Sequence, residues 1–539
     1  MIQWQIIGGL SEIAYVDWVV CLAYLLIVLS LGVWFSRSQK TNDDFFLGGR
    51  NMHWLPVGLS LFATTFSSNS FVGLPAEGAF GDYHQLLAIL FIPFIVLPIT
   101  CYWFIPFYKR LGFVSLYEYL ERRFDRKIRL FASAVFMFYS AGWMATMLLA
   151  VSRILEVVLE TDSTSHTLMM IAAVGCLATI YTAVGGVKAV IWTDTIQAFA
   201  LGGGMLVLLF FLVAQIQGGW TGLVEVAQAH DKTEMFSTRL GWGHRNIYSA
   251  CAYGFFIYLG GQIGAYGAFQ RYVTVDTIRD ARRSLVVKGI FILFVCTLFF
   301  IVGTALFVFY QQTSETVGVF EQLNNGRLRD RLLPHFVVHY AGGYGMTGLL
   351  LAGLFAAAMS SLDSGINSMT ATFVTDWYHG REVGTRVNRL LTLMFGVAVT
   401  GGAAILMLVD LPVFDILLAI AGASYGLLMG VLLMGMFSSV ANVTGVVCGM
   451  ISGVAVFAFI RVYTSASTPE QLRWLGGLAE IRNNTWWDGM FTTVTTILVG
   501  LLVSYCTRRP TPDRLTGMLL LPERRGTVAT SISGKTRED

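Results

Sequence analysis

Apolar residues along this chain are grouped into long runs that are separated by short polar stretches. Thirteen runs are about 20 residues or longer, enough for an α-helix to cross the ~30 Å hydrocarbon core of a bilayer. The pattern predicts an all-α polytopic membrane protein with about 13 transmembrane helices. The expected spans are residues 16–36, 53–78, 85–107, 128–159, 166–184, 190–216, 246–268, 287–311, 335–377, 388–409, 412–437, 442–463 and 486–506. Because the ninth run exceeds the length of one crossing, we expect a separate external helix at Leu332–Tyr340.

Two of these runs are interrupted by polar residues and glycines. In the second run, six of the seven residues from 64 to 70 carry hydroxyl or amide groups, and Gly73 and Pro75 follow. In the seventh run, four glycines and Gln262 fall between 260 and 267. Such residues weaken a regular helix and free its backbone carbonyls. Glycine-rich packing is a fair alternative for 260–267 and a poor one for 64–70.

The two interrupted runs stand five runs apart, in corresponding positions of two five-helix units. An odd number of crossings separates them, so the two units have opposite orientation in the membrane. Paired broken helices in equivalent positions are typical of an inverted-repeat transporter with its binding site near the midplane. We infer this repeat from the layout alone, because the two units share no obvious residue identity.

The ninth run carries a block of hydroxyls and one acid where lipid-facing residues would be expected. Ala357, Ser360, Ser361 and Ser364 share one helix face, and Asp363 flanks it. Oxygen ligands of this kind suit a hard cation. Close helix packing through small residues explains the alanines. It does not explain Asp363, because ionisable groups inside a bilayer are costly and are usually functional.

A second acid, Asp194, stands just inside the sixth run after Gly185 and Gly186. It has two interpretations that the sequence leaves open. It is either a carboxylate near a helix N-terminus, which stabilises the helix by a few tenths of a kcal/mol, or a member of an ion site facing the serines of the ninth run.

Composition agrees with a membrane protein and excludes several other classes. Of the 539 residues, 55% are hydrophobic and 13% are charged, whereas about a quarter are charged in a soluble domain. None of the seven cysteines forms a Cys-x-x-Cys pair, so neither a disulfide framework nor a metal cluster is indicated. No nucleophile elbow, phosphate loop or His-rich metal set is visible. We therefore expect no enzyme activity and no nucleic-acid partner.

The distribution of basic residues predicts the orientation. With the N-terminus outside and the C-terminus inside, 26 of the 36 basic residues fall in inner loops or the tail, as the positive-inside rule requires. This predicts a multi-pass protein of the plasma membrane, which is the inner membrane in a bacterium. We expect the basic tail after Arg508 to be disordered, either solvated or resting on anionic lipid.

Four motifs together resemble the sodium/solute symporter family, which includes sodium-coupled sugar, proline, sialic acid, iodide, vitamin and monocarboxylate carriers. The resemblance covers nearly the whole chain and is strongest from the second to the tenth span. The motifs are Phe45–Arg50, Gly185-Gly186 followed by Trp192–Gln197, Gln270–Tyr272 and Ala357–Ser361.

This resemblance implies a leucine-transporter-type core of two inverted five-helix repeats with broken helices. The implied division is an extra N-terminal helix and inner loop in 1–50, the first repeat in 51–217, the second repeat with external loops in 218–437, two extra helices in 438–507 and a basic cytoplasmic tail in 508–539.

The resemblance also implies a sodium site at five positions. The backbone carbonyls of Ala63, Phe66 and Ala357 would join the hydroxyls of Ser360 and Ser361 around Na⁺.

Some members of the family use a second cation site. Here it would involve Asp194, Ser360, Asp363 and Ser364. The acid at position 363 replaces a hydroxyl of the best-matched pattern, so this residue either strengthens a second cation site or binds a proton.

By the same resemblance, the solute site lies between the broken helices, with Thr65, Asn69 and Ser70 facing Tyr258 and Gln262. Gly261 replaces the aromatic gate of the sugar carriers, and Asn69-Ser70 replaces their acidic-Gln pair. The stretch 71–77 is closer to the iodide, vitamin and monocarboxylate branch. This favours a small organic anion and leaves a sugar or an amino acid open.

The predicted function is therefore sodium-coupled import of a small polar organic solute by alternating access, with Na⁺, the solute and the lipid bilayer as partners. Two alternatives are a proton-coupled carrier of the same fold and a non-transporting sensor or channel. We expect a monomer or a weak oligomer.

Overall fold

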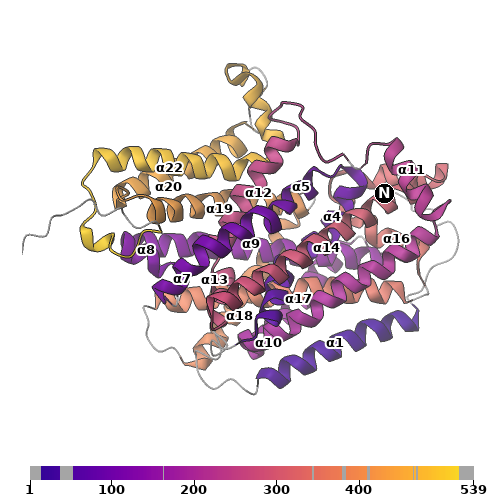
Figure 1. The fold of residues 1–539 in the computed structure, drawn as a ribbon. Coiled ribbons are helices and arrows are strands. Elements are labelled where there is room, and N and C mark those ends of the chain that lie inside the picture. The colour runs from indigo at the N-terminus through magenta and orange to yellow at the C-terminus, as the bar shows by residue number, and fades with distance from the viewer. Residues whose placement is uncertain are drawn as a thin grey trace, which may run out of the picture.

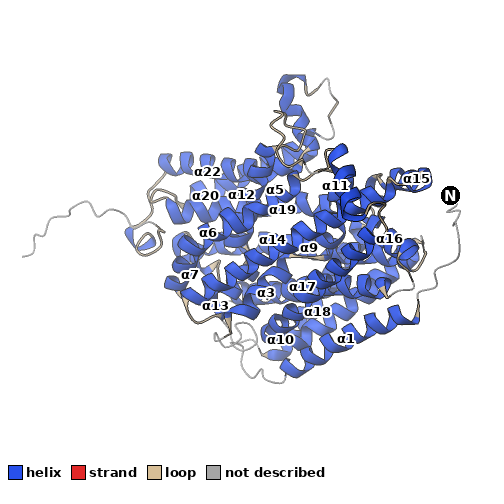
Figure 2. Cartoon of the chain, turned by 45° about the vertical axis from the view of Figure 1, so that its right-hand side comes forward, coloured by secondary structure: helices blue, strands red, loops and turns tan. Residues whose placement is uncertain are grey.

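The computed structural model describes residues 14–36 and 52–520, apart from 114, 162, 233, 343–344, 379–383, 410–412, 465–466 and 469–470. Over these residues the chain forms helices and no strand (Figure 2). Nine of the described helical segments are long and apolar enough to cross a membrane. The predicted all-α polytopic fold is thus confirmed. The principal helices are α1 (Tyr15–Ser36), α3 (Trp54–Thr65), α4 (Ser68–Phe80), α5 (His84–Phe91), α7 (Ile105–Leu111), α8 (Glu118–Arg123), α9 (Arg126–Val158), α10 (Thr164–Ala214), α12 (Ile247–Gly264), α13 (Tyr266–Thr274), α14 (Ile278–Tyr310), α16 (Leu332–Tyr340), α17 (Met346–Thr372), α18 (Thr385–Leu406), α19 (Val413–Phe437), α20 (Val443–Ala458) and α22 (Asp488–Cys506).

The helices are arranged around the two broken segments (Figure 1). The pair α3 and α4 packs against α14, while α17 packs against α10, α9 and α3. α20 and α22 lie together beside α19, and α1 covers α10 and α17 at the opposite edge. The core helices are therefore those that carry the polar residues, and the accessory helices lie outside them.

Both predicted helix breaks are present. α3 ends at Thr65, Phe66 (φ −91°, ψ 107°) and Ser67 (φ −111°, ψ 173°) are extended, and α4 begins at Ser68. α12 ends at Gly264, and α13 begins after the extended residue Ala265 (φ −85°, ψ 124°). The prediction of paired broken helices is confirmed. At each break, the last carbonyls of the first helix lack the N–H groups that a continuous helix would supply.

The predicted separate helix at Leu332–Tyr340 is also present, as α16. Gly345, with φ 78°, then turns the chain into α17, a conformation that glycine adopts without steric cost. α17 runs without interruption to Thr372 and continues as a π-helix over Phe373–Trp377. Ser360, Ser361 and Ser364, the serine block, therefore lie on one long, continuous helix.

The fifth and sixth spans differ from the prediction. The predicted spans 166–184 and 190–216 leave a connection at residues 185–189, but the backbone is helical throughout α10. Its 51 residues would measure about 75 Å at 1.5 Å per residue, more than twice the bilayer core. The helix accordingly contains two apolar lengths, Thr164–Ile180 and Val187–Ala214.

The start of the tail also differs from the prediction, which places disorder from residue 508 onward. The Tyr119 hydroxyl donates to the Met518 carbonyl at 3.2 Å, and the Leu520 amide donates to the Met436 carbonyl at 2.8 Å. Arg514 donates to the Phe124 carbonyl. Residues 511–520 therefore pack on the helical body, because their polar groups find backbone partners there. Residues 521–539 and the Phe45–Arg50 motif lie outside the described residues.

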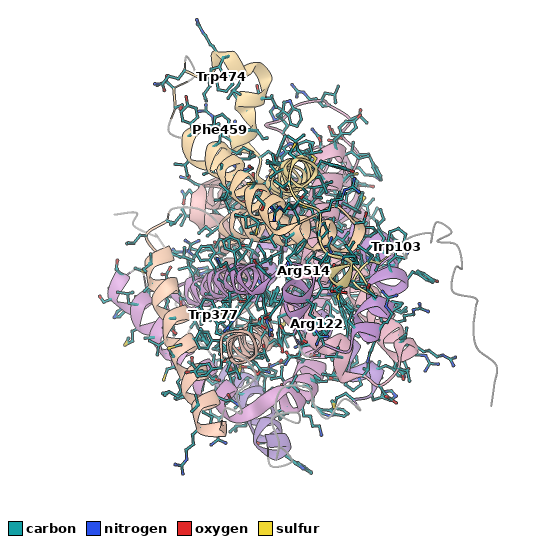
Figure 3. All side chains as sticks on the ribbon, turned by 90° about the vertical axis from the view of Figure 1, so that its left-hand side faces the viewer. Trp103, Arg122, Trp377, Phe459, Trp474 and Arg514 are labelled. Carbon is teal, nitrogen blue, oxygen red and sulfur yellow. The ribbon has the colours of Figure 1, made fainter. Side chains whose placement is uncertain are left out.

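Large apolar side chains project from the outer surface of the helices (Figure 3). Trp103 is 54% exposed and Trp377 is 42% exposed. Exposed aromatic side chains on an otherwise apolar surface are expected where lipid replaces water as the solvent. They agree with a protein embedded in the membrane by many helices.

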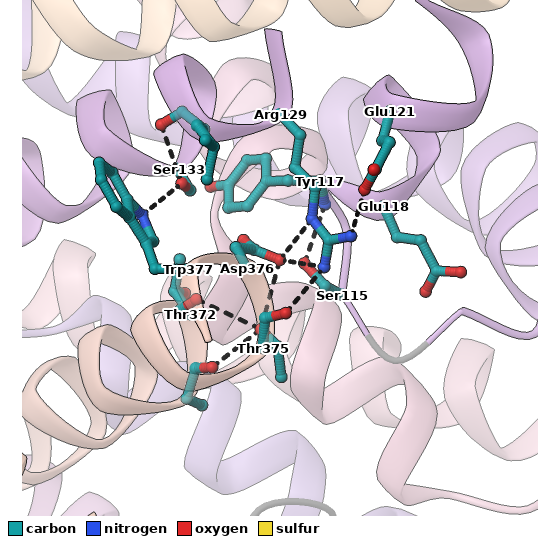
Figure 4. A network of polar contacts seen from close by, with 12 residues as sticks. Ser115, Tyr117, Glu118, Glu121, Arg129, Ser133, Thr372, Thr375, Asp376 and Trp377 are labelled. Atoms are coloured by element: carbon teal, nitrogen blue, oxygen red, sulfur yellow. Dashed lines mark hydrogen bonds and ion pairs between the residues drawn. The ribbon is translucent and has the colours of Figure 1, made fainter. Parts of the chain in front are cut away.

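One end of α17 is fixed by a buried ion-pair network (Figure 4). Arg129 donates to Asp376 Oδ1 from Nε at 2.9 Å and from Nη2 at 2.6 Å. It also pairs with Glu121, and Trp377 Nε1 donates to Ser133 Oγ at 3.1 Å. α17 is thereby held against α8 and α9, and this holds the serine block at a fixed depth.

Candidate functional site

The serines of α17 meet the first helix break. Ser360 Oγ lies 3.1 Å from the Ala63 carbonyl oxygen and 3.2 Å from that of Ala357. Ser361 Oγ lies 3.3 Å from the Thr64 carbonyl oxygen. Both hydroxyls are buried. They satisfy carbonyls at the end of α3 that have no helical partner.

Four of the five predicted sodium ligands, Ala63, Ala357, Ser360 and Ser361, therefore lie within one hydrogen-bonding cluster. The fifth, Phe66, is the extended residue at the break itself. The Thr64 carbonyl is an additional oxygen that sequence reasoning missed. Unwound backbone carbonyls and the C-terminal ends of half-helices coordinate Na⁺ in many transporters that have broken helices.

A residue that sequence reasoning did not place in the site, Arg271 of α13, joins four elements beside this cluster. Its Nε donates to Ser60 Oγ at 2.9 Å, and its Nη2 donates to Ser364 Oγ at 2.6 Å. Nη2 also lies 3.3 Å from Asp194 Oδ2, which accepts from Ser60 Oγ at 2.5 Å. Arg271 is 1% exposed and Asp194 is fully buried. Its place in the Gln270–Tyr272 motif was the available signal.

Two of the residues predicted for the second cation site contact the Arg271 guanidinium, whereas Asp363 does not. Asp194 and Ser364 both contact Arg271, so a positive charge already lies between them. Asp363 lies to one side and accepts from Thr182 Oγ1 at 2.7 Å. Within the described residues, Asp363 Oδ2 and Asp194 Oδ1 have no hydrogen-bond partner. The buried Asp363 is thus a carboxyl group that no basic side chain of the described residues contacts directly.

A cavity of about 180 Å³ lies between the two breaks. Of the predicted solute residues, Thr65, Ser70, Tyr258 and Gln262 line it. Asn69 does not, because it is fully buried and donates from Nδ2 to Thr146 Oγ1 on α9 at 2.7 Å. The break in each helix therefore brings its polar residues to the same cavity, while Asn69 holds α4 against α9.

The walls of this cavity include several aromatic side chains and two basic ones. The Tyr272 hydroxyl donates to Gln262 Oε1 at 2.7 Å, so the amide nitrogen of Gln262 is the group left for a solute. Among the described lining residues, Arg271 and Lys288 are basic and none is Asp or Glu. The aromatic lining residues include Tyr139, Trp143, Tyr253, Tyr258 and Tyr425.

The sequence was compared with protein-family models and with characterised proteins. The model of the sodium:solute symporter family matches residues 45–453. The chain is 32% identical over 461 residues to the sodium/sialic acid symporter SiaT of Proteus mirabilis, covering 83% of this chain and 90% of SiaT. It is 29% identical to the sodium/sialic acid symporter NanT of Aliivibrio fischeri, covering 90% and 92%. It is 28% identical to the human sodium/iodide cotransporter, covering 84% and 71%.

A solved structure of a Na⁺-coupled sialic acid symporter, in a substrate-bound outward-open state described as revealing a novel Na⁺ site, has the same fold. It superimposes with a TM-score of 0.79 at 28% identity and covers 93% of this chain and all of the other. The family model spans most of the chain, and it includes both helix breaks and the serine block. The chain belongs to the sodium:solute symporter family.

Proposed function

We propose that this symporter imports a small organic anion together with Na⁺ by alternating access. The observation that carries the proposal is the contact of Ser360 and Ser361 with the Ala63 and Thr64 carbonyls at the break in α3. Two hydroxyls and several carbonyls can enclose Na⁺ there without a fixed negative charge. Such a neutral site binds the ion weakly enough to release it, which transport requires.

In this proposal, the ion holds the C-terminal end of α3, at the break before α4, against α17 while the solute occupies the adjacent cavity. Thr64 joins the two sites: its hydroxyl lies 3.1 Å from Ser364 Oγ, its carbonyl meets Ser361, and it lines the cavity. Ion and solute would each favour the conformation in which the break is held in place. By linkage, each would then raise the affinity of the protein for the other.

The orientation and the domain division belong to the same proposal. The distribution of basic residues supports an outside N-terminus and a cytoplasmic C-terminus. The positions of the two breaks support a first repeat in 51–217 and a second in 218–437. The Ser360 contacts would then lie on the cytoplasmic side of the midplane, where the ion is released.

Uptake into proteoliposomes tests this function. We expect a tenfold inward Na⁺ gradient to drive accumulation of pyruvate or propionate by about tenfold per coupled ion, since a tenfold concentration ratio stores about 1.4 kcal/mol. Choline replaces Na⁺ in the control at constant pH. Uptake that proceeds equally in choline and follows a proton gradient would instead establish the proton-coupled alternative.

A second coupling ion at Asp363 is proposed from its unpartnered, buried Oδ2. We expect Asp363→Asn to lower the Hill slope of the Na⁺ dependence of uptake to about 1, because a single Na⁺ site then remains and has no second site to couple with. Thr182→Val is the matched control, since it removes the 2.7 Å partner of Asp363 and keeps the carboxylate. An unchanged slope in the Asn variant would show that Asp363 binds no coupling ion.

A further inference from the structure

Lys288 lies on the face of α14 that lines the cavity. It is followed at helical spacing by Ile292 and Cys296, and all three line the cavity. Lys288 is 1% exposed. It lies one helical turn from Ile292 and two turns from Cys296, which form an apolar part of the same wall.

No acidic side chain of the described chain forms an ion pair with Lys288. Its basic neighbour Arg271 is already paired with Asp194 at 3.3 Å. No Asp or Glu oxygen of the described residues lies within 4.0 Å of the Lys288 amine, and none of the described lining residues is acidic. The two basic residues are thus not equivalent, because only Lys288 lacks a protein counter-charge.

A buried amine without an acidic partner is costly to hold as an ammonium ion in a membrane protein, and ionisable side chains in such positions are commonly functional. The missing counter-charge cannot come from Asp363, which lies beside Thr182 of α10 and is not among the lining residues. An anion inside the cavity would contact the amine directly and would be held by a charge-assisted hydrogen bond.

We propose that Lys288 binds the anionic group of the transported solute and so selects monoanions over neutral molecules. The inference rests on the proposed function and adds to it the residue that recognises the charge. The organic part of the solute would lie toward Ile292, Cys296 and the tyrosines of the cavity. The amide of Gln262, which lies on α12 and also lines the cavity, supplies a second donor.

The test uses the purified full-length protein in detergent and measures its thermal unfolding temperature in Na⁺ and in choline. The probes are propionate, pyruvate and iodide as monoanions and propionamide as the neutral isostere of propionate. We expect Na⁺ to stabilise the wild type, and at least one monoanion to stabilise it further, with propionamide having no effect. Response to the carboxylates and not to iodide identifies an organic carboxylate; response to iodide alone identifies an inorganic monoanion.

Lys288→Met should keep the stabilisation by Na⁺ and weaken anion binding by at least about tenfold, the effect expected for one charge-assisted hydrogen bond. Lys288→Arg should retain most of the anion response. Arg283→Met is the control, because it removes a basic side chain that is 45% exposed on the same helix. If Lys288→Met does not yield folded protein, Lys288→Gln and Lys288→Arg are compared in its place.

The two proposals fail in different ways. Loss of the Na⁺ response in the wild type would overturn the sodium-coupled function itself. A normal Na⁺ response with anion binding that is equal in wild type and Lys288→Met, or with propionamide binding as well as propionate, would overturn the role of Lys288 alone. A wild type that responds to Na⁺ and to none of the three monoanions would also overturn it.

Discussion

Replacing both Ser360 and Ser361 with alanine is expected to raise the Na⁺ concentration for half-maximal uptake by at least about tenfold. The two hydroxyls are the side-chain oxygens of the proposed site, and they lie 3.1 and 3.3 Å from the Ala63 and Thr64 carbonyls. We take the loss of an oxygen ligand to Na⁺ to cost about as much as the loss of a hydrogen bond to a charged group, about 1.5–3 kcal/mol, and 1.4 kcal/mol corresponds to a factor of ten. Initial rates of uptake across a Na⁺ series measure the change.

The control for this variant is Thr370→Ala on the same helix. Thr370 is also fully buried, but its hydroxyl donates to the Ile366 carbonyl of its own turn at 2.9 Å and is remote from the break. It should lower stability to a similar extent and leave the Na⁺ dependence unchanged. Identical Na⁺ curves for the double-alanine variant and the wild type would remove these serines from the ion site.

Replacing Arg271 with methionine is expected to lower the free energy of unfolding by about 3–5 kcal/mol, the usual effect of leaving one member of a buried ion pair without its partner. Asp194 would lose its basic partner, and Ser60 and Ser364 would lose the guanidinium as a donor. Because Arg271 connects α3, α10, α13 and α17, uptake should be lost as well. The fraction of monodisperse protein after heating measures the loss of stability.

Two further variants distinguish the loss of the buried Arg271–Asp194 pair from the general effect of removing an arginine on stability. The double variant Arg271→Met with Asp194→Asn should recover much of the lost stability, because no uncompensated charge then remains in the interior. Arg283→Met should behave like the wild type, since exposed ion pairs contribute little. If Arg271→Met were as stable as Arg283→Met, the network would not hold the four elements together.

The helices, their breaks and the serine block followed from the order of residue types. Apolar runs of spanning length must form helices in lipid, because the backbone has no other source of hydrogen bonds there. Six polar residues out of seven between 64 and 70 cannot remain in such a helix without a function. The same local logic found the separate helix Leu332–Tyr340. It was wrong at residues 185–189, where two separate spans were predicted and the backbone forms one continuous helix.

What the sequence by itself determined was which segments cross the membrane and which of them bend. Only the tertiary structure decided which polar groups meet, because those contacts join residues that are distant in sequence. In the tertiary structure, the Ser361 hydroxyl lies against the Thr64 carbonyl. Arg271 pairs with Asp194 and donates to Ser364. Asn69 points away from the cavity and donates to Thr146. The tertiary structure also left Lys288 facing the cavity without an acid. The sequence pattern sets the helices through local backbone chemistry, whereas charge pairing depends on how helices rotate against one another.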